Sequence, residues 1–220
     1  MRIIEARNIS RSFDNNKVLS SLDLDVEKGE FLTISGRSGV GKSTLLGILG
    51  THDLNYEGEL RIGDKETGKL ASSELALLRR KYLGFVFQDF HLLPSLTAIE
   101  NVILPAVFSG SNLEDAHNQA KEVLDKLSIR ISDTKTSLLS RGERQRVAVA
   151  RGLVNKPSVL LADEPSASLD DESEQILFDL LDDLRRQQNF ALIAVVHSTK
   201  ILQRSDRILE LKNGSLHEVI

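Results

Sequence analysis

The sequence contains no cysteine, so disulfide bonds and thiolate metal sites are excluded. This absence is common in reducing compartments, although it does not by itself define one. Aromatic residues are also scarce, at 5% of the chain, which is too few for a platform that stacks the bases of single-stranded nucleic acid. The formal net charge is -4 and no long block of Lys or Arg is present, so we expect no nucleic-acid partner.

Long hydrophobic runs are missing as well. The longest, such as Ala191 to Val196, are far too short to cross a bilayer. The first segment, MRIIEARNIS, alternates like a strand and lacks the apolar stretch of a secretory signal. If the protein serves a membrane process, we expect another chain to cross the membrane.

What the sequence does contain is the balance of a soluble globular protein, with 40% hydrophobic and 27% charged residues over 220 positions. That length suits one domain, or one domain with a subdomain, and no internal repeat or low-complexity linker is visible. Apolar alternation and short apolar runs predict strands, and helical spacing of apolar residues predicts helices. The predicted strands cover 22–26, 31–35, 58–63, 84–88, 159–162, 191–196, 207–211 and 215–219, and the predicted helices cover 42–49, most of 99–155 and a segment marked by 176–184.

A glycine-rich segment between a predicted strand and a predicted helix matches G-x-x-x-x-G-K-[ST], the phosphate loop. It reads Gly36, Arg37, Ser38, Gly39, Val40, Gly41, Lys42, Ser43 and Thr44. Glycines let backbone N–H groups turn toward phosphate oxygens, and the helix that follows points its positive end at the same anion. Lys42 would reach the β- and γ-phosphates and Ser43 would hold Mg²⁺. A surface glycine turn is the alternative, but the strand before and the helix after favour nucleotide binding.

An apolar strand at 159–162 ends in two carboxylates, Asp163 and Glu164. In open α/β sheets, ligands gather at such strand ends. Asp163 would reach Mg²⁺ through water, and Glu164 would polarise the water that attacks the γ-phosphate. The alternative is a solvated turn before Pro165, which the phosphate loop makes less attractive.

Two more polar residues follow predicted strands of the same sheet, Gln88 and His197. By themselves they would be read as a surface glutamine and a structural histidine. At the ends of these strands, Gln88 could touch Mg²⁺ or the attacking water, and His197 could donate a hydrogen bond to the γ-phosphate.

The segment from Leu139 to Arg151, which reads LSRGERQRVAVAR, makes the pattern specific. It resembles the signature motif of the ATP-binding-cassette (ABC) ATPases, and the resemblance covers essentially the whole chain. The motifs also follow the order of that family: the phosphate loop, Gln88, the signature, Asp163 with Glu164, the segment Ser168, Leu169 and Asp170, and then His197.

The resemblance implies an α/β fold, with a RecA-like P-loop NTPase core, an N-terminal antiparallel β subdomain and an inserted α-helical subdomain at about 90–155. All of these would belong to a single nucleotide-binding domain over 1–220. It also implies a head-to-tail pair of cassettes in which Ser140 and Gly142 bind the partner's nucleotide and Asp170 contacts the opposite subunit. Phe13 matches the position where the family places an aromatic ring against adenine, with a core phenylalanine as the alternative.

One position departs from the family pattern. Arg141 stands where the family usually has glycine, which allows a close backbone approach to phosphate. An arginine that points away would help to hold the anion, whereas one that points inward would hinder closure. Glu143 in place of glutamine is a smaller departure, and the presence of Glu164 and His197 favours true hydrolysis.

The stretch from Phe87 to Val102 narrows the resemblance to the bacterial lipoprotein-releasing and macrolide-efflux type of cassette. Such cassettes drive a membrane partner with few spans, and they either move a substrate or only transmit force. The candidates for a groove that receives a cytoplasmic helix of that partner are Phe90, Leu92, Leu93 and Leu96. For each of them, a place in the core is the alternative.

The function that follows from the resemblance is an ATPase that binds and hydrolyses ATP with Mg²⁺ and powers a transporter. Its partners would be a second cassette, identical or not, and a transmembrane permease subunit, which would hold it at the cytoplasmic face of the inner or plasma membrane. The cargo is not visible, because in this family specificity lies mainly with the membrane subunit.

Three other functions remain open. A regulatory ATPase of a membrane complex that moves no substrate would look the same in sequence. A nucleotide-binding partner with impaired turnover is suggested by Arg141. A soluble cassette that acts on DNA or ribosomes usually carries a long insertion or a second cassette, neither of which is present here.

Overall fold

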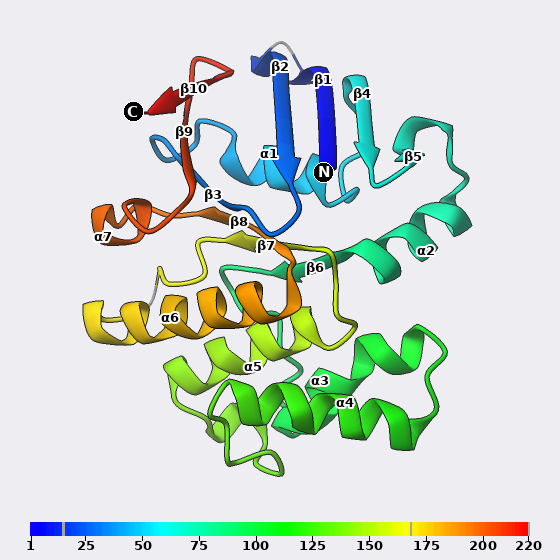
Figure 1. The fold of residues 1–220 in the computed structure, drawn as a ribbon, viewed down its shortest axis with the longest axis vertical. Coiled ribbons are helices and arrows are strands. Elements are labelled where there is room, and N and C mark those ends of the chain that lie inside the picture. Colours follow the sequence, from blue (N-terminus) through cyan, green and yellow to red (C-terminus); the bar gives the residue numbers. More distant parts are fainter. Residues whose placement is uncertain (15, 168, 220) are drawn as a thin grey trace.

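The computed structural model describes residues 1–14, 16–167 and 169–219, and it places two sheets above a block of helices (Figure 1). The strands are β1 (Arg2–Phe13), β2 (Asn16–Glu27), β3 (Phe31–Ser35), β4 (Glu57–Ile62), β5 (Lys65–Glu66), β6 (Leu83–Val86), β7 (Val159–Asp163), β8 (Ala191–Val195), β9 (Arg207–Lys212) and β10 (Ser215–Val219). The helices are α1 (Lys42–Leu49), α2 (Ser72–Tyr82), α3 (Ala98–Phe108), α4 (Leu113–Lys126), α5 (Arg141–Leu153), α6 (Asp171–Gln188) and α7 (Thr199–Leu202), with short 3₁₀ turns η1 (Thr67–Lys69) and η2 (Thr136–Leu138).

The smaller sheet is antiparallel, in the order β2-β1-β4-β5. Its longest strands show the alternation that the sequence predicts, because Leu22, Leu24 and Val26 of β2 are buried and the residues between them are more exposed. This sheet covers α1 from above (Figure 1).

The larger sheet has the order β10-β9-β3-β8-β7-β6. Strands β9, β3, β8, β7 and β6 are parallel, with β6 at one edge, and β10 returns antiparallel to β9 at the other edge. β8 is buried along its whole length, which is why it reads as a continuous apolar run rather than an alternating one.

Alternate residues of the larger sheet serve two separate cores. Leu32 and Ile34 of β3 pack upward with the apolar face of α1 and with the antiparallel sheet. Phe31 packs downward among α3, α4, α5 and α6, where its ring stacks on Phe178 with centroids 6.0 Å apart. α1 is therefore held between the two sheets, and its N-terminus is fixed at the carboxyl end of β3.

The helical block is joined to the sheet through a contact between glycine backbones. A Cβ atom on Gly84 of β6 would lie 2.1 Å from the carbonyl oxygen of Gly152 in α5. No side chain fits in that space, so the C-terminal end of α5 is seated directly on the sheet.

The strands and helices predicted from the sequence are present, with small differences in extent. β6 ends at Val86 rather than Gln88, and the long helical region consists of α3, α4 and α5 separated by loops and η2. Helix α2 was missed apart from its basic last turn, because it is only 11 residues long and buries just Leu75 and Leu78, which gives a weak periodic signal.

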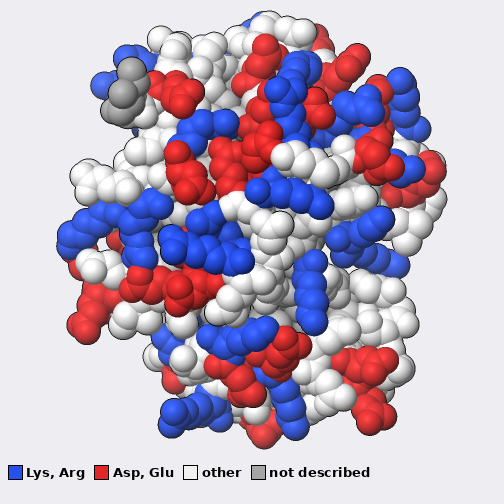
Figure 2. Space-filling model, in the orientation of Figure 1, with Lys and Arg blue, Asp and Glu red and all other residues white. Residues whose placement is uncertain are grey.

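The described surface carries both signs of charge. Positive and negative side chains are interspersed over the face in Figure 2, as expected from ion pairs such as Arg7 with Asp25 at 2.6 Å and Arg186 with Asp182 at 2.8 Å. Among the described residues, no helix has the length and the apolar character needed to span a membrane.

Candidate functional site

The phosphate loop connects β3 to α1 and is shaped by glycines that other residues could not replace. Gly41 has a φ of 111° and caps α1, and a Cβ there would lie 2.5 Å from Val18 Cγ1. Gly36 has a φ of 144°, and a Cβ there would lie 2.6 Å from the Leu211 carbonyl oxygen. The loop therefore keeps its backbone free of side chains at the N-terminus of a helix, which is a natural anion site.

Lys42 lies within the curve of this loop. Its Nζ donates hydrogen bonds to the carbonyl oxygens of Gly36 and Arg37 at 3.0 and 3.1 Å. The residue is 5% exposed, which places a positive charge at the base of the loop and away from bulk water.

An open cleft of about 410 Å³ brings most of the predicted site residues together. Its lining consists of Phe13, Val18, Ser38, Gly39, Gly41, Lys42, Ser43, Thr44, Gln88 and Glu164. Phe13 lies at the end of β1 and is 45% exposed, so it is not the core phenylalanine of the alternative interpretation.

Asp163 ends β7 beside the loop. Burial raises the pKa of its carboxyl group, and the charge on Glu164 acts in the same direction, while Ser43 and Lys42 act to lower it. Its Oδ1 atom is buried and has no hydrogen-bond partner among the residues that the structure describes. A carboxylate held in this way beside a hydroxyl suits Mg²⁺, which binds few protein oxygens and takes its remaining ligands from phosphates and water.

Glu164 is held in an unusual conformation next to His197. Its φ of 46° lies in the left-handed region, which costs a residue with a side chain about 1–3 kcal/mol. Its Oε1 lies 2.9 Å from Nε2 of His197, which follows β8, the neighbouring parallel strand. The carboxylate and the imidazole therefore meet at the edge of the sheet where the phosphate loop begins.

Gln88 is exposed and is followed by a turn that is held from another helix. Phe90 and His91 both have positive φ values, 61° and 48°. The guanidinium of Arg151, in the last turn of α5, donates hydrogen bonds to both carbonyl oxygens, and burial lowers the pKa of this group. In the sequence, Arg151 is visible only as the end of the signature motif, and no pattern there predicts this contact.

The signature segment is ordered but lies apart from the cleft. Ser140 is the N-cap of α5, where its Oγ accepts from the Glu143 N–H at 3.3 Å and Glu143 accepts from the Ser140 N–H at 2.8 Å. Arg141 is exposed in the first turn. Within the part of the chain that the structure describes, the atom nearest to a Cβ on Gly142 would be Leu169 Cδ2, at 4.0 Å.

Asp170 is also apart from the cleft and caps α6, where it accepts a hydrogen bond from the Ser173 N–H at 2.8 Å. Hydrogen bonds from Ser173 lower the pKa of its carboxyl group. Ser168, in the same motif, lies outside the described residues.

An apolar cleft of about 220 Å³ opens between the sheet and the helical block. It is lined by Gly50, His52, Arg79, Arg80, Leu83, Gly84, Phe85, Pro105, Phe108 and Asn155. The four residues predicted for a partner groove do not line it. Leu92 packs against the core, Phe90 lies 5.9 Å from the guanidinium of Arg144, and Leu93 remains 48% exposed.

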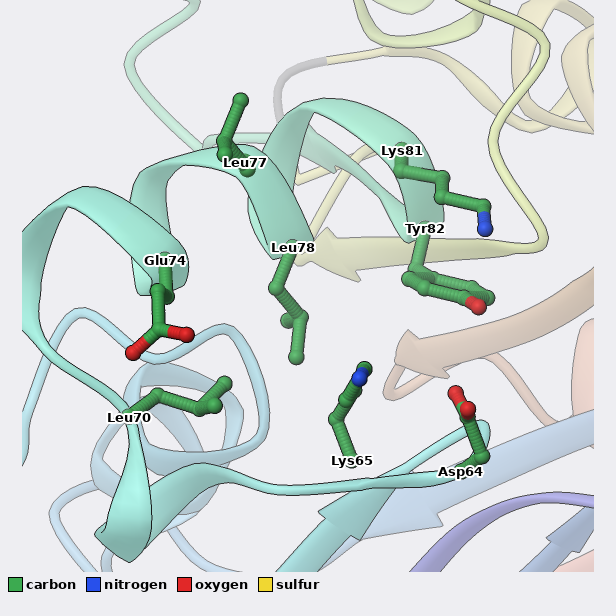
Figure 3. Close-up of a pocket in the computed structure, with 8 residues that line it drawn as sticks. All are labelled: Asp64, Lys65, Leu70, Glu74, Leu77, Leu78, Lys81 and Tyr82. Atoms are coloured by element: carbon green, nitrogen blue, oxygen red, sulfur yellow. The ribbon is translucent and has the colours of Figure 1, made fainter.

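A further cleft of about 420 Å³ lies between α2 and the β4–β5 turn (Figure 3). Leu70, Leu78 and Tyr82 converge on it, with acidic and basic side chains around them. None of the predicted site residues lines this cleft, so it is not the one where the motifs meet, although its volume is similar.

The fold and the loop cleft together define a P-loop nucleotide-binding protein. The profile of the family described as ABC transporter matches residues 19–167. The chain belongs to the ABC transporter family as one of its ATP-binding, ATP-hydrolysing cassettes.

Several relatives and solved structures are similar over nearly the whole chain. The lipoprotein-releasing system ATP-binding protein LolD of Xanthomonas campestris pv. campestris is 42% identical, covering 99% of this chain and 93% of its own length. The LolD protein of Porphyromonas gingivalis is 43% identical, covering 97% of this chain and 98% of its own length. The macrolide export ATP-binding/permease protein MacB of Campylobacter jejuni is 40% identical over 97% of this chain, which matches only 33% of that longer protein.

Among solved structures, a dimeric ATP-binding cassette in a post-hydrolysis state with ADP and Pi has a TM-score of 0.90 and 35% identity, covering 98% of this chain and 97% of its own. The fold class and the family expected from the motifs are thus confirmed.

Proposed function

We propose that the cleft at the phosphate loop binds ATP with Mg²⁺ and that Glu164 activates the water that hydrolyses it. The proposal rests above all on the pairing of Glu164 and His197, 2.9 Å apart, at the sheet edge beside Lys42. Residues held in strained backbone conformations cluster at active sites, which favours a catalytic role for Glu164.

The phosphates would lie against the loop, where Gly36, Ser38, Gly39, Gly41 and Thr44 contribute backbone N–H groups and Lys42 contributes its charge. The adenine would stack on Phe13, which closes one end of the same cleft.

Ser43 and Asp163 would hold Mg²⁺, Asp163 through water, with Gln88 as a further oxygen ligand. When bound, the ion neutralises charge that builds up on the phosphate oxygens. The orphaned Oδ1 of Asp163 supports this assignment, because a buried carboxylate oxygen without a donor suits an ion or its water.

In the reaction, Glu164 would accept a hydrogen bond from the attacking water and orient it in line with the γ-phosphate. His197 would hold Glu164 in its rotamer before the nucleotide binds, and its N–H would then donate to the γ-phosphate instead. Gln88, exposed at the rim of the cleft, would contact the same water.

The signature would act on the nucleotide of a second cassette. Gly142 supports this step, because none of the residues that the structure describes lies close enough to require a glycine there. Its Cβ position is open and its backbone is helical, where glycine costs about 0.5–1 kcal/mol relative to alanine. A phosphate from another subunit, bound by Ser140 and the first turn of α5, would use that space, and Asp170 would contact the same subunit.

The decisive test of the chemistry is Glu164→Gln in the purified protein. We expect Mg-ATP to bind with unchanged affinity and hydrolysis to fall at least tenfold, which is about 1.4 kcal/mol of barrier. Glu172→Gln, an exposed acid in the first turn of α6, is the matched control and should hydrolyse ATP normally. Hydrolysis near the normal rate in Glu164→Gln would remove this residue from the role.

The membrane partner would dock in the apolar cleft at His52, Phe85 and Phe108. Every charged residue that lines it is basic, Arg79 and Arg80, so an amphipathic helix with an apolar face and at least one carboxylate fits. Through such a partner the protein would lie at the cytoplasmic face of the membrane. The names of its relatives point to lipoprotein release or macrolide export as the process it serves.

This docking is testable by co-purification in mild detergent. Phe108 is 69% exposed and Leu113 is 68% exposed, which makes them a matched pair. We expect Phe108→Ser to lose the co-purifying membrane protein and Leu113→Ser to keep it, with ATPase of the isolated chain unchanged in both. Equal recovery in the two variants would place the docking surface elsewhere.

One alternative is a cassette with impaired turnover, which the arginine at position 141 suggests. If its bulk blocks closure, Arg141→Gly should raise ATP hydrolysis strongly. We expect a change of less than about threefold, because the side chain is exposed at the start of α5 rather than turned into its own chain.

A further inference from the structure

Phe13 is backed by a positive charge. The Cζ atom of Arg11 lies 4.0 Å from the centroid of the Phe13 ring, within the range of a cation–π contact. The two residues are two positions apart on β1 and therefore project from the same face of the strand.

The ring of Phe13 stands between two spaces. Phe13 lines the cleft of the phosphate loop, whereas Arg11 lines a separate cleft of about 260 Å³ with Asn55, Tyr56 and Glu57. The guanidinium thus contacts the ring of Phe13 and does not line the nucleotide cleft.

Arg11 is itself fixed by the carboxylate of Asp53. Its Nε donates to Asp53 Oδ2 at 2.7 Å, and Nη1 donates to the Ser12 carbonyl oxygen at 2.6 Å. The Arg11 and Asp53 side chains are only 12% and 23% exposed, so this ion pair is better shielded than a surface pair.

Asp53 in turn is anchored to the helix that carries the phosphate loop. Its backbone N–H donates to the carbonyl oxygen of Gly47 in α1 at 3.1 Å, and its Oδ1 accepts from the Asn55 N–H at 2.9 Å. The chain of contacts from Phe13 through Arg11 and Asp53 to α1 joins the aromatic end of the cleft to its phosphate end.

We infer that Arg11 is a positioning residue for nucleobase binding, which holds Phe13 as a stacking platform at a fixed distance from α1. The inference rests on the proposed function, in which Phe13 takes the adenine. Phe13 lies at the tip of the β1–β2 hairpin, and a ring that is already fixed loses less rotamer freedom when a base stacks on it. Asp53 supports the platform indirectly, because it orients Arg11.

The test compares a ligand that has a base with one that lacks it, Mg-ADP and Mg-pyrophosphate, by calorimetric titration of the purified protein. We expect Phe13→Ala to weaken Mg-ADP by about tenfold, the usual effect of losing a base-stacking partner. Arg11→Ala should weaken Mg-ADP by about threefold, in line with a partly exposed cation–π contact. Neither change should affect Mg-pyrophosphate, and Arg11→Ala should add nothing in the Phe13→Ala background.

Two further variants test the physical basis. Arg11→Lys keeps the charge and should recover part of the Mg-ADP affinity, and Asp53→Asn should weaken it in the same direction as Arg11→Ala. Arg7→Ala is the matched control, because Arg7 lies on the same strand in an ion pair with Asp25 at 2.6 Å and does not line the cleft.

The outcomes distinguish the positioning role of Arg11 from the adenine site at Phe13. If Phe13→Ala weakens Mg-ADP and Arg11→Ala does not, or if Arg11→Ala weakens both ligands equally, the positioning role of Arg11 is wrong and the site stands. If Phe13→Ala has no effect on Mg-ADP, the adenine site itself is wrong and the inference fails with it.

Discussion

The phosphate loop and the signature segment differ in how many of their contacts come from their own chain. At the phosphate loop, Lys42 is held by two backbone carbonyl oxygens and Glu164 by His197. At the signature, Ser140 and Glu143 cap a helix, but Arg141 is exposed and Gly142 leaves room for a Cβ atom among the described residues. The first half-site is thus organised within one chain, and the second has the features of a surface that another molecule completes.

The largest effect should come from the phosphate-loop side. Lys42→Ala removes the charge within the loop, so we expect Mg-ADP affinity to fall at least about a hundredfold, or about 2.7 kcal/mol. Lys69→Ala removes an exposed lysine paired with Glu66 at 2.8 Å and should bind normally. Binding by Lys42→Ala within about threefold of normal would break the contrast between the two half-sites.

The connection between the half-sites should be the next most sensitive point. Arg151→Ala leaves two carbonyl oxygens of a left-handed turn without their charged donor, so we expect a loss of about 1.5–3 kcal/mol in the free energy of unfolding. ATP hydrolysis should also fall, because Gln88 loses its fixed turn, while Mg-ADP binding should not change. The control is Arg186→Ala, whose ion pair with Asp182 is exposed on the arginine side. Unaltered stability and hydrolysis in Arg151→Ala would mean that the turn keeps its conformation without the hydrogen bonds from Arg151.

On the signature side, we expect Gly142→Ala to separate stability from activity. The variant should melt at the same temperature or slightly higher, because alanine favours a helix and the Cβ position is open. Hydrolysis should fall about tenfold, or about 1.4 kcal/mol of barrier, if a second subunit's phosphate needs that space. Gly152→Ala on the same helix is the matched contrast, since its Cβ would lie 3.1 Å from the Phe85 carbonyl oxygen and should lower stability. Full activity in Gly142→Ala would argue against a second subunit's phosphate binding beside Gly142.

The smallest effect should concern the pH dependence of stability at Asp163. Burial raises the pKa of this carboxyl above its ordinary value of 3.8, so its ionisation opposes folding. This penalty grows as the pH rises from the ordinary value to the raised pKa, and it is constant above that. Without Mg²⁺ and nucleotide, Asp163→Asn should therefore melt higher at pH 7, by about 2–4 °C if the gain is about 1 kcal/mol. The difference should vanish well below pH 3.8, where the carboxyl is protonated in both states. A lower melting temperature at pH 7 would show that the carboxylate stabilises the fold.

The parts that could be predicted from the sequence are those whose physics is local. The phosphate loop needs glycines, a lysine and a helix start within nine consecutive residues, so its pattern is visible in one segment. Asp163, Glu164, Gln88 and His197 were identified because each directly or closely follows an apolar strand, and parallel strands bring their carboxyl ends to one edge.

The parts that could not be predicted depend on pairs far apart in the chain. Arg11 and Asp53 are 42 positions apart, and Arg151 is 60 positions from His91, with no spacing rule to join them. The apolar cleft was missed for the same reason. The cleft is lined by residues after α1, along β6 and at the end of α3, so no single segment of the sequence predicts it.

The position of β3 in the larger sheet has a consequence for folding during synthesis on the ribosome. β3 carries the phosphate loop at its end, yet its hydrogen-bonded neighbours are β8 and β9, both more than 150 residues downstream. At the usual rate of translation, that gap corresponds to about 10–30 s. During this time the phosphate loop is already made but its strand lacks both of its neighbours, so we expect the nascent chain to bind ATP only after nearly all of it has emerged.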